Sequence, residues 1–271
     1  MKNKNHIVIY AFLIGLSLLA LLPFFWTLHA AFILDDLNLN RGFLPFEDYG
    51  IANFIFIFRQ SAVLRWTMNS FFVTITITLF NLLFNSMAGY ALARYQFKGR
   101  TALFFYVLGT MMVPVQIIMI PIYLQVARLG MINSYFGLII PFLINPFGVF
   151  LMRQFYMDFP TEIEEAAKID GLSNLGVFRR IALPLAKSAL MTQAIFIFVW
   201  NWNSFTLPSI LVYSQDKFTL PLGIFQITNT QYIASVTRAM AATLITLTPT
   251  IALYITFQKY LTGNQASSAI K

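Results

Sequence analysis

Six long apolar runs, none of which contains a Lys, Arg, Asp or Glu, dominate this chain of 271 residues. Each run reaches or approaches the roughly 20 apolar residues that an α-helix needs to cross a bilayer. The sequence therefore predicts an all-α membrane protein with six transmembrane helices in a single domain, residues 1–271. The expected spans are residues 7–32, 66–93, 101–127, 132–152, 189–215 and 239–258.

The composition excludes a soluble domain, because only 10% of the residues are charged whereas soluble proteins carry about 25%. The net charge of +8 would suit a nucleic-acid binder if it were gathered on one face. Here the basic residues are scattered between apolar runs, so we expect no nucleic-acid partner. The absence of Cys excludes disulfides, thiol catalysis and Cys-ligated metal sites.

Prolines occur inside several of the apolar runs. They are tolerated in membrane helices because neighbouring helices and waters satisfy the carbonyl groups that they free. Kinked helices of this kind suit a bundle that opens and closes. The positions are Pro114, Pro121, Pro141, Pro146, Pro208 and Pro249.

The distribution of Lys and Arg between the runs predicts the orientation of the chain, because cytoplasmic loops carry an excess of basic residues. With both termini in the cytoplasm, twelve basic residues lie inside and six outside. The first run could be read as a cleaved signal peptide. This run is 26 residues long and exceeds the 7–15 residues of a signal peptide's apolar region, which favours an uncleaved first span.

The most polar stretch, residues 158–187, lies between the fourth and fifth runs and is predicted to be cytoplasmic. Thr161 and Glu164 have the spacing of a capping box, with Thr161 as N-cap of a short helix. Glu164 and Lys168 have the i,i+4 order that favours an ion pair on a helix. Residues alone leave two readings open, a solvated amphipathic loop and a docking element for a partner protein.

A second short helix is expected after a tight turn in the same loop. Gly171 is free to adopt the left-handed conformation that ends a helix, and Ser173 is suited to cap the next one. This second helix carries Phe178 on its apolar side, and Pro184 is expected to stop or kink it. The loop thus reads as two helices joined by a rigid glycine turn.

The residues of this loop resemble a known signature. Glu165-Ala166-Ala167-x-x-Asp170-Gly171, followed by Phe178 and Pro184, is similar to the EAA motif of the membrane subunits of binding-protein-dependent ABC importers. The chain departs from that motif at Leu172, where Ala is usual, and at Ser188, where a second Pro is common.

The resemblance extends along nearly the whole chain, from about Pro23 onward, and is greatest to the carbohydrate-type permeases, similar to the MalG family of maltose and multiple-sugar transporters. It includes residues 90–100 at the second cytoplasmic junction. It also includes residues 202–205, where Ser204 replaces the usual acid. The resemblance implies the MetI-like ABC importer fold in the plasma membrane of a bacterium or archaeon.

The resemblance implies that the chain is a permease subunit and that its loop couples it to a cytoplasmic ATPase. The expected partners are two copies of the ATP-binding subunit, a second permease, an extracytoplasmic solute-binding protein and a sugar. The chain has no Gly-x-x-x-x-Gly-Lys-Ser/Thr loop, so ATP is bound by the partner. We therefore expect no enzyme activity, no cofactor and no metal site here. The expected docking residues are Glu165, Ala166, Ala167, Asp170, Gly171, Phe178 and Pro184.

Polar residues within membrane spans are the natural candidates for a substrate path, although they serve equally well as hydrogen-bonding contacts between helices. Aromatic faces combined with amides suit a sugar, whose C–H faces stack on rings and whose hydroxyl groups need hydrogen bonds. The sequence predicts a path along Trp202, Asn203, Ser204, Phe205 and Asn145. Asn81, Asn85 and Asn201 are further polar residues within the runs.

Three other functions would be compatible with an apolar chain of this length. An importer of the same type for glycerol phosphate would need cations in its cavity, and the runs contain none. An ion-coupled secondary transporter tends to place acids within its spans, and a membrane enzyme would need a buried acid, His or Ser dyad. Neither pattern is present in the sequence.

Overall fold

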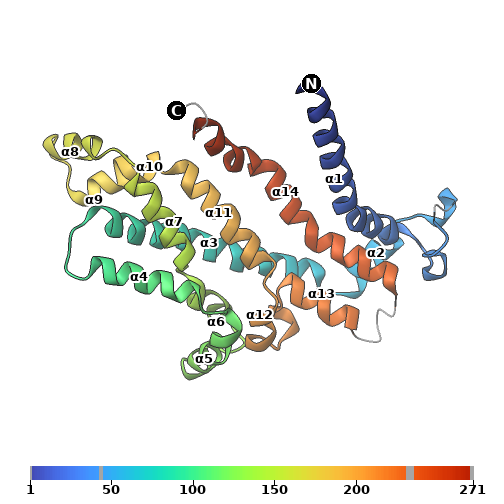
Figure 1. The fold of residues 1–271 in the computed structure, drawn as a ribbon. Helices are drawn as coiled ribbons and strands as arrows, with labels where there is room; N and C mark the ends of the chain where they lie inside the picture. The colour runs from blue at the N-terminus through green and yellow to red at the C-terminus, as the bar shows by residue number, and fades with distance from the viewer. Residues whose placement is uncertain (1, 43–44, 230–234, 269–271) are drawn as a thin grey trace. The chain divides into compact units, whose positions relative to one another are not determined.

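The computed structural model describes residues 2–42, 45–229 and 235–268 of the chain (Figure 1). Helices form nearly all of this part. The α-helices are α1 (Lys2–Phe32), α2 (Ala52–Gln60), α3 (Val63–Arg94), α4 (Arg100–Met111), α5 (Val115–Arg128), α6 (Tyr135–Ile139), α7 (Pro146–Met157), α8 (Thr161–Ile169), α9 (Asn174–Val177), α10 (Leu183–Leu185), α11 (Lys187–Trp202), α12 (Thr206–Leu211), α13 (Leu220–Asn229) and α14 (Val236–Ser268). The shorter turns are the 3-10 helices η1 (Asp36–Asn38), η2 (Phe46–Asp48), η3 (Ile140–Phe142) and η5 (Gln215–Lys217) and the π-helix η4 (Phe178–Ala182).

The helices agree with an all-α membrane protein. Within the described residues, four helices or helix runs are long and apolar enough to cross a bilayer, and the number rises to six if each of two bent helix pairs is one span. The chain divides into two compact units, unit 1 with residues 1–64 and 223–249 and unit 2 with residues 65–222 and 250–271. The expectation of a single domain stays a prediction.

Unit 1 contains α1 and α2, which are joined by a side-chain contact. Asn53 on α2 donates from Nδ2 to the carbonyl groups of Ala31 and Ile33, at 3.1 and 2.8 Å. Asp36 accepts a hydrogen bond from the backbone N–H of Thr237 in the first turn of α14. Burial alone would raise the pKa of Asp36, but hydrogen bonds, that of Thr237 foremost, lower it below its usual value.

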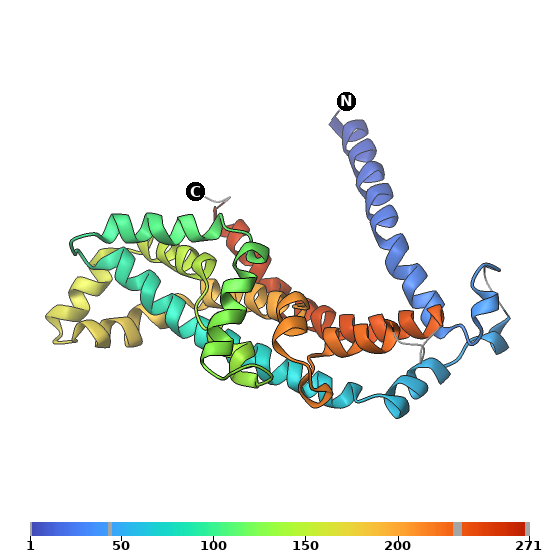
Figure 2. The same cartoon turned by 90° about the horizontal axis from the view of Figure 1, so that it is seen from below.

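In unit 2, side-chain hydrogen bonds join α3 to η3, α7 and α8. The helix α7 packs against both α4 and α11, and α12 packs against α5 and α6. The short helices α8 and α9 lie at the end of unit 2 where α3 terminates, away from α12, as two views show (Figures 1 and 2). The core at this end is formed by a cluster of buried residues, which includes Tyr90, Met152, Tyr156, Phe178 and Ala182.

The predicted third span, residues 101–127, is not one straight helix. The chain bends by 102° between α4 and α5, and Pro114 is the N-cap of α5. The ring of a proline disfavours helical geometry in the residue before it, so α4 ends ahead of Val113. The sequence identified the apolar run and a proline kink within it, but not that the kink is a full break between two helices.

The predicted fourth span, residues 132–152, is divided as well. It begins with α6, continues through η3 and resumes as α7, which runs to Met157. Pro146 occupies the first turn of α7 and Asn145 caps it by accepting from the Gly148 N–H at 3.2 Å. Proline is tolerated at that position because the N–H it lacks would have no partner there.

The fifth span was predicted too long, at residues 189–215. The helix α11 ends at Trp202, and Asn203 is its C-cap. The side chain of Asn203 donates from Nδ2 to the carbonyl of Val199, so it bonds to the last turn of its own helix. Asparagine favours such local bonds over helix continuation, and the chain turns before α12.

Candidate functional site

The polar loop forms the two helices that the sequence predicts, but the capping box does not form. Pro160 is the N-cap of α8, and no side chain caps the helix. A capping box requires the glutamate at the third helical position to reach the N–H of the N-cap residue. With Pro160 as the N-cap, the third helical position is Ile163, so Glu164 lies one residue too far along the helix for a capping box and bonds elsewhere. The assignment of Thr161 as N-cap is therefore wrong.

The glycine turn of the loop is confirmed. Gly171 has φ of +86°, in the left-handed region, and its N–H and that of Leu172 close the end of α8 on the carbonyl groups of Lys168 and Ala167. A Cβ at Gly171 would meet nothing within 4 Å, so the need for glycine is conformational. Ser173 caps α9 by accepting from the Gly176 N–H at 3.2 Å, as predicted.

Pro184 ends the second helix in the predicted way. The helix from Asn174 to Leu185 and the helix from Lys187 to Trp202 meet at an angle of 74°. Just before the proline the turns widen into η4, where the Leu183 N–H donates to the carbonyl of Phe178. A proline cannot supply the i→i−4 bond, and a π-turn is a common local adjustment at such a point.

The loop presents part of its signature outward and buries the rest. Glu165, Ala166 and Asp170 are exposed, whereas Ala167 and Phe178 are buried. Ile169, between the signature residues, exposes 86% of its surface. Phe178 packs against Tyr90 with ring centroids 5.1 Å apart, so its contribution to docking would be to anchor the loop.

Glu164 is a functional candidate that the sequence reading missed. It is only 4% exposed, and its carboxylate accepts from Tyr90 Oη at 3.0 Å and from Arg94 Nε at 2.9 Å. Arg94 also donates to the carbonyl of Phe159, which precedes α8. This Arg94–Glu164 pair joins the first helix of the loop to the end of α3.

The predicted ion pair of Glu164 with Lys168 is wrong, because Glu164 turns inward while Lys168 stays exposed. A signal for this was present in the sequence. Positions 164 and 167 share one face of a helix, and Ala167 on that face is small enough for close packing. Burial, and then the charge of Glu164, raise the pKa of Tyr95 just beyond α3.

A second candidate site is a cavity of about 210 Å³ between α3, the start of α7 and α11. Its wall combines amides with aromatic rings. The Trp200 indole on this wall is 73% exposed, while Phe147 and Phe196 meet edge to face at 6.0 Å. The amides and aromatic rings of the wall include Asn81, Asn145, Phe147, Phe196, Trp200 and Asn201.

Behind this cavity lies a buried network of amides. Asn85 donates from Nδ2 to Asn81 Oδ1 at 3.1 Å and accepts at Oδ1 from the Asn145 N–H at 3.0 Å. Gln193 on α11 donates to the carbonyl of Asn81. Gly148 fits between these side chains, since a Cβ there would lie 2.1 Å from Asn85 Nδ2. The network holds three helices in register around the cavity.

The predicted substrate path coincides with this cavity only at Asn145. Trp202 is buried, stacks on Phe198 with an interplanar angle of 7°, and contacts Phe71. Asn203 caps α11, and Ser204 and Phe205 lie in the turn that follows. A role for these four in the path stays a prediction; Trp200 and Asn201, just before them, line the cavity instead.

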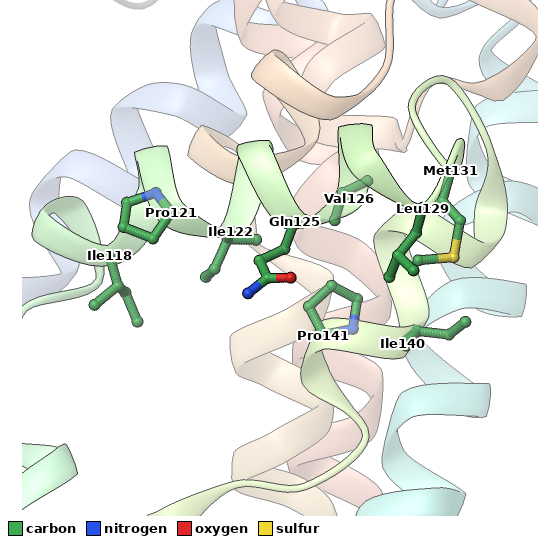
Figure 3. A pocket seen from close by; sticks show the side chains of 9 residues that line it. All are labelled: Ile118, Pro121, Ile122, Gln125, Val126, Leu129, Met131, Ile140 and Pro141. Carbon is green, nitrogen blue, oxygen red and sulfur yellow. The ribbon is translucent and has the colours of Figure 1, made fainter.

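A larger pocket of about 310 Å³ lies beside α5 (Figure 3). The side chain of Gln125 extends from α5 toward Pro141, and hydrocarbon surrounds it. A wall with one amide offers few hydrogen bonds to a hydroxylated solute. The apolar residues of this pocket include Ile118, Pro121, Ile122, Val126 and Pro141.

Comparison with known proteins identifies the family of this chain. Residues 85–263, more than half of the chain and including the loop and most of the cavity, match the binding-protein-dependent transport system inner membrane component. The chain belongs to this family. It is a multi-pass membrane permease subunit of an ABC importer and not an enzyme, and it works with a separate ATPase, a second permease and a binding protein.

Curated relatives are similar over most of their length. The arabinooligosaccharides transport system permease protein AraQ of Bacillus subtilis is 33% identical over 271 residues, covering 98% of this chain and 96% of the relative. The lactose transport system permease protein LacG of Rhizobium radiobacter is 28% identical and covers 95% and 94%.

A solved structure supports the fold. The crystal structure of a bacterial ABC transporter involved in the import of the acidic polysaccharide alginate includes a chain that superposes with a TM-score of 0.84. The two chains are 23% identical, and the match covers 96% of this chain and 98% of the other. The MetI-like importer architecture expected from the sequence is thereby confirmed.

Proposed function

We propose that this chain is a permease subunit of an ATP-driven importer for a sugar or oligosaccharide, which a solute-binding protein delivers. The observation that carries the proposal is the loop from Thr161 to Leu185, with its left-handed Gly171 and its exposed Ile169. An isoleucine so exposed beside acidic residues, on the face predicted to be cytoplasmic, suits a socket on another protein. The sugar assignment is supported by the relatives, whose names specify oligosaccharides and lactose.

The mechanism that we propose runs along α3. Closure of two ATPase subunits on ATP would move the docked loop, and the Arg94–Glu164 pair would transmit the motion to the end of α3. Asn81 on the same helix lines the cavity, 13 residues before Arg94 (94 − 81), which is about 20 Å along a helix. A rigid helix with two alternative positions is the kind of element that links distant sites.

The docking face is tested by replacing Ile169 with Asp in the complete transporter. We expect the ATPase subunit to be lost on co-purification, because a charge would have to be buried in the joint. Leu37→Asp is the matched control, since Leu37 is similarly exposed in unit 1. Equal co-purification of the ATPase with both variants would count against docking through this loop.

The hinge is tested by Gly171→Pro, which we expect to abolish ATPase stimulation by the loaded binding protein while membrane insertion persists. Proline cannot adopt the positive φ of this turn. Normal stimulation in the variant would contradict the hinge role.

The orientation of the chain belongs to the same proposal. The bias of basic residues supports a cytoplasmic position for both termini and the loop. The chain has no native Cys, so single-cysteine variants report topology directly. In right-side-out vesicles, an impermeant maleimide is expected to label Leu37→Cys and spare Ser173→Cys. The opposite pattern would invert the proposed topology.

A further inference from the structure

We propose that the cavity between α3, α7 and α11 is a transport subsite for one ring of an uncharged sugar. This inference rests on the proposed function and specifies the solute class. At about 210 Å³ the cavity is smaller than the roughly 300–1,000 Å³ typical of pockets for drug-sized ligands. A single ring is therefore the appropriate size of occupant, with the remainder of an oligosaccharide outside the cavity.

The first argument concerns the hydrogen-bonding atoms that the wall leaves available. Asn81 has no N–H group left, because Nδ2 donates to the carbonyl groups of Ile77 and Phe142, and its Oδ1 already accepts from Asn85. Asn145 uses Oδ1 to accept from Gly148. Among the described residues, none accepts from Asn145 Nδ2, so both of its N–H groups remain at the wall.

Asn201 supplies the complementary atom. Its Nδ2 donates to the carbonyl of Ile197 at 2.8 Å, and nothing in the described part of the chain donates to its Oδ1. Both amide orientations are fixed by their partners, since a carbonyl can only accept and the Gly148 N–H can only donate. The cavity thus offers the N–H donors of Asn145 and, at Asn201, an acceptor oxygen beside one remaining N–H.

A hydroxyl group both donates and accepts, so it matches such a pair, whereas a carboxylate or phosphate can only accept. An anion at this wall would face the Oδ1 of Asn201 without a proton to share. The lining contains no Lys or Arg to compensate for the charge, and an unpaired charge in such surroundings is costly. The chemistry of the wall selects an uncharged polyol over an acidic sugar.

The second argument concerns the rings. Trp200 is 73% exposed on the cavity wall, where its indole is available to stack on the C–H face of a sugar. A tryptophan suits such a site because its ring offers a large apolar surface and its indole N–H can donate a hydrogen bond. Phe147 and Phe196 complete an apolar wall, so the cavity pairs ring faces with a donor and an acceptor.

The test measures occupancy and not transport. In the complete transporter in nanodiscs, Ile144→Cys places a thiol on the cavity wall, and Tyr213→Cys places one at an exposed aromatic position outside it. Maleimide labelling of this chain is followed by gel while saturating lactose, maltose, arabinobiose or digalacturonate is present. We expect at least one uncharged sugar to slow labelling of Ile144→Cys and leave Tyr213→Cys unchanged, and digalacturonate to protect neither.

Substitutions at Trp200 sharpen the test. Trp200→Ala is expected to weaken protection by about 2- to 12-fold in sugar concentration, the range of one aromatic pair, while Trp200→Phe retains most of it. Protection by digalacturonate equal to that by uncharged sugars would overturn the proposal. So would the absence of protection by every uncharged sugar of the panel.

A separate assay keeps the two proposals distinguishable. ATPase stimulation by the loaded binding protein is measured on the same preparation with the unaltered chain. Stimulation without protection would remove the subsite and leave the importer function standing. A preparation without ATPase stimulation would contradict the importer function itself.

Discussion

The polar loop and the amide-lined cavity are built in opposite ways. The loop is one continuous segment, from Thr161 to Leu185, whose turn and caps are set by neighbours in sequence. The cavity is assembled from α3, α7 and α11, which are distant in sequence and meet only through packing and the amide network. The loop's shape is therefore local and resistant to change elsewhere, whereas the cavity depends on three helices at once.

Breaking the Arg94–Glu164 pair is expected to cause the largest loss of stability. Glu164→Ala leaves Arg94, whose side chain is only 11% exposed, without its carboxylate partner, and we expect a loss of about 3 kcal/mol, the low end for broken buried ion pairs. Thermal unfolding of the purified chain, followed by fluorescence, measures it. Glu165→Ala, exposed in the same helix, is the control and is expected to change stability by less than about 0.5 kcal/mol. Equal effects would show that the loop is not anchored through Glu164.

A substitution at Gly148 tests whether the cavity depends on close packing of its three helices. In Gly148→Ala the new methyl group would meet Asn85 Nδ2 and Gln193 Nε2, and overpacking of this kind costs about 1–3 kcal/mol. We expect impaired uptake in proteoliposomes with normal co-purification of the ATPase. Gly109→Ala is the control, since its Cβ would meet nothing within 4 Å. Loss of the ATPase in Gly148→Ala would mean that cavity and loop are not separable.

Gly171→Ala is the corresponding local change in the loop. Its cost is the left-handed backbone, about 1–2 kcal/mol, because the surrounding space is open. We expect reduced ATPase stimulation with little change in the thermal unfolding of the whole chain, and a smaller reduction for Gly171→Asn, since asparagine tolerates this conformation. A larger reduction for Asn than for Ala would contradict the argument from φ.

The smallest expected effect is the difference between alanine substitutions at Asn201 and at Asn203. The sequence favoured Asn203 for the substrate path, whereas the structure places Asn201 in the cavity wall. Asn201→Ala is expected to raise the half-saturating concentration for uptake, and Asn203→Ala to leave it unchanged. The reverse result would restore the path predicted from the sequence.

The sequence predicted the loop better than the cavity for a physical reason. Gly171, Ser173 and Pro184 act through their own backbone and their immediate neighbours, so their effects could be read in order along the chain. Glu164 was misassigned because its partners, Tyr90 and Arg94, lie about 70 residues away. Only the three-dimensional arrangement showed that its side chain points inward.

The cavity was less predictable for the same reason. Asn145 was identified as a polar residue in a span, but nothing along the chain indicated that Asn201 and Trp200, not Asn203 and Trp202, would share its cavity. That distinction depends on where α11 faces α3 and α7. The breaks near Pro114 and Trp202 were missed in part because an apolar run reports hydrophobicity and not straightness.

The central claim is that α3 carries the motion of the loop to the cavity. It is tested most directly by the maleimide labelling rate of Ile144→Cys in the complete transporter, with and without a non-hydrolysable ATP analogue. We predict that the nucleotide changes this rate when Glu164 is intact and has no effect in Glu164→Gln, provided that the ATPase still co-purifies. An unchanged nucleotide response in Glu164→Gln would contradict the claim.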